Sequence, residues 1–178
     1  MNRLDISPIL EAISFAARKH VGQLRKDNAT PYIAHPMRVM TILATVFQVE
    51  DPEVLAAAAL HDTIEDTATD RDELIAQFGD RVAEMVAILS KDKRKPDAPR
   101  EQEYFDGLRF APIEVRLCKL ADLYDNLSDA ANLLPTSRGK TIAKAQQALE
   151  VFSPDFPDDY RWALERFEQR LKITVSTM

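Results

Sequence analysis

The chain has 178 residues, 46% of them hydrophobic and 29% charged, which suits a globular protein with a sizeable core. Its net charge of −6 argues against binding to a nucleic-acid polymer, which draws on dense basic patches, but allows a small anionic ligand in a local basic pocket. No apolar run has the length of a membrane span, no signal-peptide core follows the N-terminus, and the single Cys118 fits a reducing compartment. We therefore expect one cytoplasmic domain over residues 1–178.

The first predicted helix begins at Ser7-Pro8, where serine is the expected N-cap and proline the first helical residue. Its expected buried stripe consists of Ile9, Leu10, Ile13 and Ala17, with His20 in phase. Residues 22–32 form a polar connector that carries Arg25 and Lys26. From the residues alone, a solvated loop is the simplest interpretation of this basic pair.

The next two helices carry the histidines. Pro36 suits the first turn of a helix, so His35 lies at its start, where its ring can lean into the core. Asp51-Pro52 repeats the cap-and-proline signal and begins an alanine-rich helix that leads into His61.

The later chain is also helical in pattern. Thr69 is the expected cap of a helix that stops at Gly79, and Asp80 is expected to cap the next one. Residues 91–99 have no apolar period and are bracketed by prolines, so they predict a loop, either a solvated connector or a cationic lid. Further helices are expected over residues 100–110, from Pro112, over 138–152 and over 157–171. The predicted class is all-α.

The residues that point to chemistry are His61, Asp62, Glu65 and Asp66. In a continuous helix, residues four apart lie one turn apart, so these four side chains would share one broad face. Burying acids and an imidazole together is costly unless a cation accompanies them. A capped helix end with solvated acids is the competing interpretation.

A metal site needs ligands from elsewhere in the chain. Borderline divalent cations accept mixed imidazole and carboxylate ligands, and the set His35, His61, Asp62 and Asp122 would leave positions open for water and substrate. The thiolates of a closed structural zinc site are missing from this set.

Several segments together resemble the HD-domain superfamily, in particular the hydrolase domain of the RelA/SpoT group and the stand-alone, MESH1-like small alarmone hydrolases. They occur in the order of that family and span residues 12 to about 130, whereas residues 131–178 match nothing specific. The segments are HVGQLRKD at 20–27, PYIAHP at 31–36, AALHDTIEDT at 58–67, FGDRVA at 78–83 and KLADLYDNL at 119–127.

The resemblance implies an HD-domain bundle of roughly eight or more helices that hydrolyses the 3′-pyrophosphate of ppGpp or pppGpp. It implies one divalent metal, most often Mn²⁺. The implied metal ligands are His35, His61, Asp62 and Asp122. The implied catalytic residues are Glu65 and Asp66, which act on the water, and the implied substrate-binding residues are Arg25, Lys26 and Asn126.

The chain departs from the family pattern in and directly after the last segment, with Leu123 and Ser128 where basic residues are common and an additional acid at Asp125. These departures leave the implied metal ligands intact and fall among the implied substrate contacts. The alternatives are an HD phosphohydrolase for another nucleotide phosphate, such as the 2′-phosphate of NADPH, and a non-catalytic nucleotide-binding module.

Overall fold

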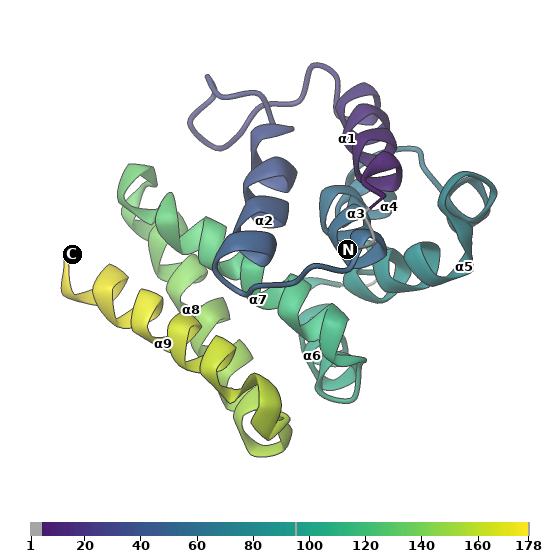
Figure 1. Ribbon diagram of the computed structural model, residues 1–178. Helices are drawn as coiled ribbons and strands as arrows, with labels where there is room; N and C mark the ends of the chain where they lie inside the picture. The colour runs from purple at the N-terminus through teal and green to yellow at the C-terminus, as the bar shows by residue number, and fades with distance from the viewer. Residues whose placement is uncertain (1–4, 95, 178) are drawn as a thin grey trace.

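The computed structural model describes residues 5–94 and 96–177, with side chains 97–99 excepted. These ranges contain nine α-helices, short 3₁₀ turns and no strand beyond one isolated bridge between Leu24 and Pro31. The expected all-α class is therefore confirmed (Figure 1). The helices are α1 (Ser7–Lys19), α2 (Ala34–Thr45), α3 (Pro52–Leu60), α4 (Thr63–Asp66), α5 (Arg71–Leu89), α6 (Asp97–Arg109), α7 (Ile113–Ser128), α8 (Pro135–Phe152) and α9 (Arg161–Ser176).

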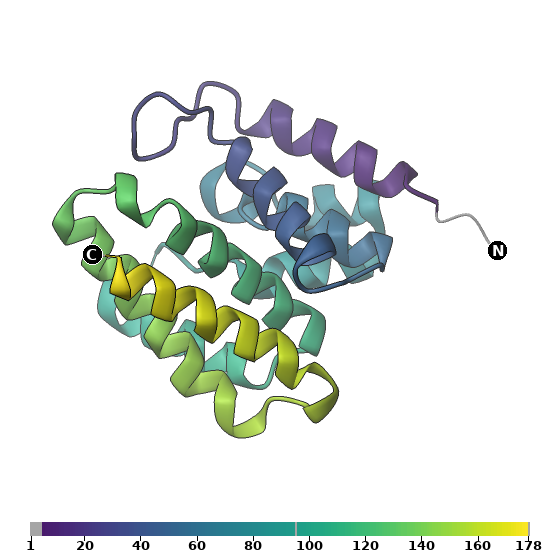
Figure 2. The same ribbon diagram turned by 60° about the vertical axis from the view of Figure 1, so that its left-hand side comes forward.

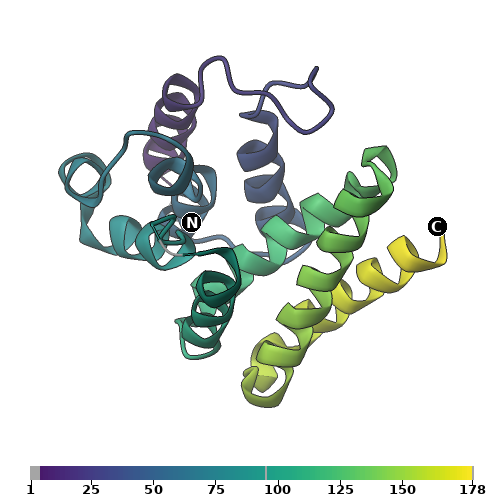
Figure 3. The ribbon, with the colours of Figure 1, turned by 180° about the vertical axis from the view of Figure 1, so that it is seen from behind.

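Two buried helices organise the bundle. Every residue of α3 from Val54 to Leu60 is buried, and α3 contacts α1, α2, α5 and α7. Helix α7 contacts α2 on one side and the pair α8 and α9 on the other. Figures 1 and 3 show α7 passing between these groups, and Figure 2 shows α8 and α9 running side by side. The inner surfaces of α2, α3 and α7 therefore meet inside one bundle, whereas the division into a single domain stays a prediction.

The caps were predicted correctly at one helix and wrongly at two. The Asp51 side chain accepts a hydrogen bond from the Glu53 N–H at 2.9 Å, as expected for the start of α3. Ser7 does not cap α1; the Asp5 carboxylate accepts from the Ser7 N–H instead. Likewise Asp70, rather than Thr69, caps α5 by accepting from the Glu73 N–H at 2.8 Å. A carboxylate next to a hydroxyl is an equally good acceptor, so the sequence leaves the choice open.

The buried face of α1 also differs from the expected one. Ala12, Phe15 and Ala16 are buried, whereas Leu10 is exposed and Ala17 lies at the surface. The buried stripe of α1 is therefore rotated relative to the predicted one. Its Phe15 ring packs edge-on against Phe78 of α5 at 5.4 Å between ring centroids.

Two helices are interrupted, one at the glycine where a break was predicted and one at the candidate site where none was predicted. Gly79 has φ 82° and ψ 168°, a conformation that favours glycine, so the helix bends there and continues to Leu89. The predicted continuous helix through residues 61–66 is wrong, since α3 ends at Leu60 and α4 begins at Thr63. His61 and Asp62 therefore lie on the turn between α3 and α4.

Candidate active site

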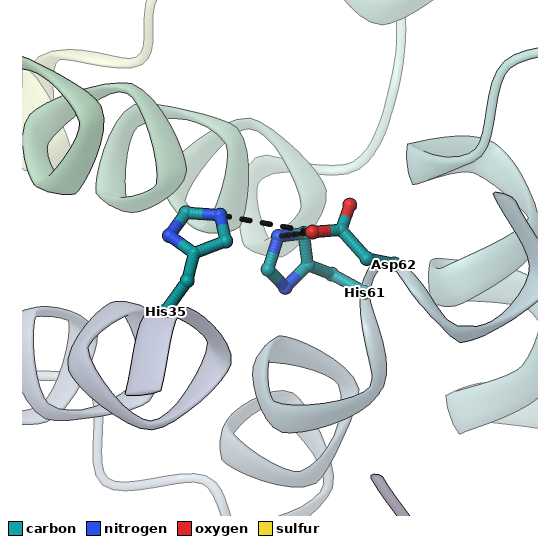
Figure 4. A group of neighbouring side chains, drawn as sticks. All are labelled: His35, His61 and Asp62. Atoms are coloured by element: carbon teal, nitrogen blue, oxygen red, sulfur yellow. Dashed lines mark ion pairs between the residues drawn. The ribbon is translucent and has the colours of Figure 1, made fainter. Parts of the chain in front are cut away.

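A compact cluster forms where α2 meets the turn after α3. His35 projects from the first turn of α2 toward His61 and Asp62 (Figure 4). One nitrogen or oxygen from each of the three lies within 4.8 Å of the others. Asp62 Oδ2 is 2.9 Å from His61 Nε2 and 3.7 Å from His35 Nε2. The fold thus converges three potential metal-ligand atoms on one point.

Asp122 adds a fourth side chain, and the second acid, from α7. Its Oδ1 lies 3.2 Å from His35 Nε2, and its Oδ2 accepts a hydrogen bond from Lys119 Nζ at 2.7 Å. Asp122 falls outside the three-residue cluster defined by mutual distances, yet it contacts the same histidine nitrogen. The structure therefore brings all four predicted ligands to one place, with Asp122 at its edge.

In both imidazoles Nε2 is the inner nitrogen, which faces the cluster, and Nδ1 is the outer nitrogen, which is held by another protein group. His35 Nδ1 is 2.7 Å from Asp125 Oδ2, and His61 Nδ1 is 2.8 Å from the Ala58 carbonyl oxygen. His61 Nε2 is buried and has no hydrogen bond of good geometry within the described residues. Because the inner nitrogens face carboxylates while the outer ones are engaged, the donor set fits a divalent cation.

The charges in the cluster compensate one another in the metal-free protein. Burial opposes protonation of His35, but its hydrogen bonds with Asp122 and Asp125 outweigh burial and raise its pKa to about 9. Although burial favours neutral acids, the charges of His61 and His35 hold the pKa of Asp62 well below its usual range. Lys119 and His35 do the same for Asp122. Both carboxylates are therefore ionised at neutral pH, as ligands for a cation must be.

Glu65 and Asp66 extend the cluster along α4. Glu65 Oε2 accepts a hydrogen bond from the Lys91 backbone N–H at 3.0 Å. Asp66 pairs with the Lys93 ammonium and accepts a hydrogen bond from the Tyr32 hydroxyl at 3.3 Å. That hydroxyl also donates to Asp62 Oδ2 at 2.5 Å, and burial together with the Asp62 charge raises the Tyr32 pKa, so it remains a donor. Tyr32 thus connects Asp66 to the cluster of His35, His61 and Asp62.

These residues line a pocket of about 410 Å³. Every site residue expected from the sequence borders it, namely Arg25, Lys26, His35, His61, Asp62, Glu65, Asp66, Asp122 and Asn126. The pocket also contains cations that the sequence did not single out, Lys119 from α7 and Lys140 and Lys144 from α8. The spacing of the α8 lysines puts them on one helix face, which is the only local signal they carry.

The expected substrate residues differ in their surroundings. Arg25 is not on a solvated loop, since its Nη2 donates to Asp129 Oδ2 at 2.9 Å and its side chain is 14% exposed. Lys26 is exposed at the pocket rim. Asn126 Nδ2 donates to Asp122 Oδ1 at 2.6 Å, so the amide orients a proposed metal ligand.

The predicted loop over residues 91–99 is shorter than expected. Helix α6 begins at Asp97, earlier than the predicted residue 100, while Lys95 lies outside the described residues. The ammonium of Lys91 lies 4.0 Å from Glu65 Oε1, and the ammonium of Lys93 forms an ion pair with Asp66. This segment is therefore more than a solvated connector, while its role as a lid stays a prediction.

Three further residues near the site make packing contacts. His20 is buried, with its ring 4.9 Å from that of Tyr32 and its Nδ1 2.9 Å from Gln23 Oε1. Burial raises the pKa of the Cys118 thiol to about 12, which disfavours the nucleophilic thiolate. The Tyr124 ring packs edge-on against Phe47.

Comparisons with known proteins agree with this geometry. A family model described as HD domain matches residues 12–154. The guanosine-3′,5′-bis(diphosphate) 3′-pyrophosphohydrolase MESH1 of Danio rerio is 39% identical over 151 residues, covering 84% of this chain and 83% of that protein. MESH1 of Homo sapiens is 41% identical over 132 residues, covering 74% of each.

A solved structure has the same fold. It is described as a metazoan ortholog of SpoT that hydrolyses ppGpp and plays a role in starvation responses, and it matches with a TM-score of 0.80 and 28% identity. The match covers 92% of this chain and 95% of that one. None of the helices in the described ranges has the length and apolarity needed to cross a membrane. Fold, site geometry and sequence similarity agree, and the chain belongs to the HD-domain family.

Proposed function

We propose that this protein is a metal-dependent hydrolase that removes the 3′-pyrophosphate of ppGpp or pppGpp, giving GDP or GTP and pyrophosphate. The observation that carries the proposal is that the metal-ligand cluster, two further carboxylates and a set of cations line one pocket of about 410 Å³. The MESH1 relatives, whose names state this activity, support the choice of substrate.

The proposed metal ligands are His35, His61, Asp62 and Asp122, with Mn²⁺ as the expected ion. Two imidazole nitrogens and two carboxylates suit manganese and similar borderline cations. When bound, such a cation polarises the phosphoryl group and lowers the pKa of a water molecule. Asn126 and Lys119 hold the two oxygens of Asp122, which fixes the orientation of that ligand.

Glu65 and Asp66 are the proposed acid–base residues. The water oxygen forms a bond to the phosphorus that carries the 3′ oxygen, and the bond between that phosphorus and the 3′ oxygen breaks. Glu65 or Asp66 accepts the proton that the water loses, and the departing 3′ oxygen takes up a proton. The Lys91 N–H and the Tyr32 hydroxyl restrict these two carboxylates, so they are held before substrate arrives.

The basic residues of the pocket are proposed to bind the phosphates. Lys26 lies in the connector between α1 and α2, and Lys91 lies between α5 and α6. Lys140 and Lys144 line the pocket from α8. They offset the negative charge of the substrate in an otherwise acidic protein, and they stabilise the charge that develops on the transferred phosphorus. Arg25 donates a hydrogen bond to Asp129, so it stabilises the pocket wall in addition to its proposed contact with the phosphates.

A product assay tests the proposal. The full chain is incubated with ppGpp, pppGpp or NADPH and with Mn²⁺, Mg²⁺ or Zn²⁺, and pyrophosphate and orthophosphate are measured separately. We expect pyrophosphate from the guanosine substrates and dependence on Mn²⁺. Orthophosphate from NADPH alone would instead identify a phosphomonoesterase, and nucleotide binding without turnover would identify a sensor module. The cytoplasmic location stays a prediction.

A further inference from the structure

Asp125 is a buried acid that the proposed reaction does not use. It lies on α7, three residues after Asp122, and its side chain is 0% exposed. Residues three apart share a helix face. Helix α7 therefore presents two carboxylates to His35, with Asp122 Oδ1 3.2 Å from Nε2 and Asp125 Oδ2 2.7 Å from Nδ1. One imidazole is contacted by acids at both nitrogens.

The charge of Asp125 is balanced by arginines rather than by the metal site. Arg38 Nε lies 2.6 Å from Asp125 Oδ1, and Arg25 Nη2 lies 3.4 Å from Asp125 Oδ2. Both arginines also contact Asp129, at 2.8 and 2.9 Å. A buried carboxylate is stable when charged partners and hydrogen bonds accompany it. These contacts therefore allow Asp125 to remain an acceptor beside His35.

The two proposed histidine ligands are held differently. The Nδ1 partner of His61 is the neutral carbonyl of Ala58, whereas the Nδ1 partner of His35 is a carboxylate. An Nδ1–H donated to a carboxylate leaves the lone pair on Nε2, fixes the ring orientation and makes the imidazole a stronger ligand. The chain thus contains an asymmetry between its histidines that the ligand set alone does not reveal.

We propose that Asp125 is a positioning residue that holds His35 with its Nε2 toward the metal, and that Arg38 and Arg25 hold Asp125 in place. This role rests on the proposed metal site. It also explains the acid at residue 125, which the sequence showed only as a departure from the family pattern. Because Arg25 lies in the connector before α2, the network joins that connector to the metal ligand.

The first test is Mn²⁺ affinity of the full chain, measured by titration calorimetry. Loss of such an outer partner typically weakens metal binding by about 10- to 100-fold, and we expect Asp125→Asn to fall in this range. The matched control is Asp129→Asn, which removes a carboxylate from the same arginines but keeps the His35 partner; its affinity should remain within about threefold of wild type, well below that loss. Equal affinities for Asp125→Asn and wild type would overturn the proposal, as would equal losses in both variants.

A second readout separates positioning from a general structural role. If Asp125 acts through metal binding, raising the Mn²⁺ concentration should restore the turnover of Asp125→Asn on ppGpp. A turnover defect that persists at saturating Mn²⁺ would contradict this. If wild type binds no Mn²⁺, the proposed function fails at its metal site; if wild type binds and Asp125→Asn binds equally, only the role of Asp125 fails.

A measurement on wild type keeps the proposal testable if Asp125→Asn does not fold. Nitrogen NMR of the protein loaded with Zn²⁺, a diamagnetic probe, reports which nitrogen of His35 carries the metal and which carries the proton. We expect metal at Nε2 and a hydrogen-bonded proton at Nδ1. Metal at Nδ1, or an Nδ1 without a proton, would overturn the assignment.

Discussion

Glu101 allows a quantitative prediction about substrate affinity. This residue lies one turn into α6, and its Oε1 is 3.1 Å from Lys91 Nζ and 3.0 Å from Lys144 Nζ. Both lysines line the pocket and are proposed to bind phosphate. The carboxylate therefore occupies the position between two cations that an anionic substrate would use. Glu101→Gln removes the competing charge while keeping the size of the side chain.

The magnitude follows from the two contacts. The side chains are 23% exposed for Glu101, 14% for Lys91 and 44% for Lys144, so solvent weakens both ion pairs. Each such pair contributes about 0.5–1 kcal/mol, near the upper end for accessible pairs. Displacing both ion pairs therefore reduces the binding free energy of the substrate by about 1–2 kcal/mol. Each 1.4 kcal/mol of binding free energy is about a factor of ten in affinity. Glu101→Gln should therefore lower KM for ppGpp by about 5- to 30-fold.

The assay is steady-state kinetics with ppGpp and Mn²⁺ at low salt. We expect kcat to change little, because Glu101 makes none of the described contacts to the proposed metal ligands, and a change in uniform binding appears in KM. Glu103→Gln is the matched control, since it removes the same charge from an exposed position on α6 outside the pocket. A KM that stays constant or rises in Glu101→Gln would refute the reasoning and make Glu101 an organiser of the two lysines.

Other predictions concern catalysis, pH and the fold. Glu65→Gln should lower kcat on ppGpp by about 100- to 10,000-fold while Mn²⁺ affinity is retained, and loss of both would make Glu65 a ligand. His35 in the metal-free protein has a pKa of about 9, so a proton must leave before a cation binds at neutral pH. Mn²⁺ affinity should therefore rise as the pH approaches about 9. Calorimetry at pH 7 in two buffers of different ionisation enthalpy should show proton release, and equal heats would contradict it. Gly79→Ala should lower the free energy of unfolding in urea by about 1–3 kcal/mol, because φ 82° and ψ 168° disfavour any side chain, and an unchanged midpoint would contradict this.

The side chains that the sequence singled out lie together in the structure, whereas the local structure around them differs from the prediction. His35, His61, Asp62 and Asp122 were selected by their chemistry and by family resemblance, and the structure brings them together. The turn that carries His61 and Asp62 was expected as continuous helix, because no glycine or proline marks the break.

Sequence reasoning missed several cations that only tertiary packing brings to the site. Lys140 and Lys144 look like an ordinary solvated helix face, and only the packing of α8 against α6 and α7 brings them to the pocket. Asp125 likewise has no local partner in the sequence, since His35 and Arg38 come from α2. Pairings between distant helices depend on the whole fold and leave no periodic signal.

The most direct test of the proposed function is hydrolysis of ppGpp in ¹⁸O-labelled water with Mn²⁺. Attack on the phosphorus predicts equimolar GDP and pyrophosphate, with the label in pyrophosphate and none at the 3′ oxygen of GDP. His61→Ala should abolish both the products and Mn²⁺ binding. Intact ppGpp at high enzyme concentration, orthophosphate as the product, or label at the 3′ oxygen would contradict the proposed function.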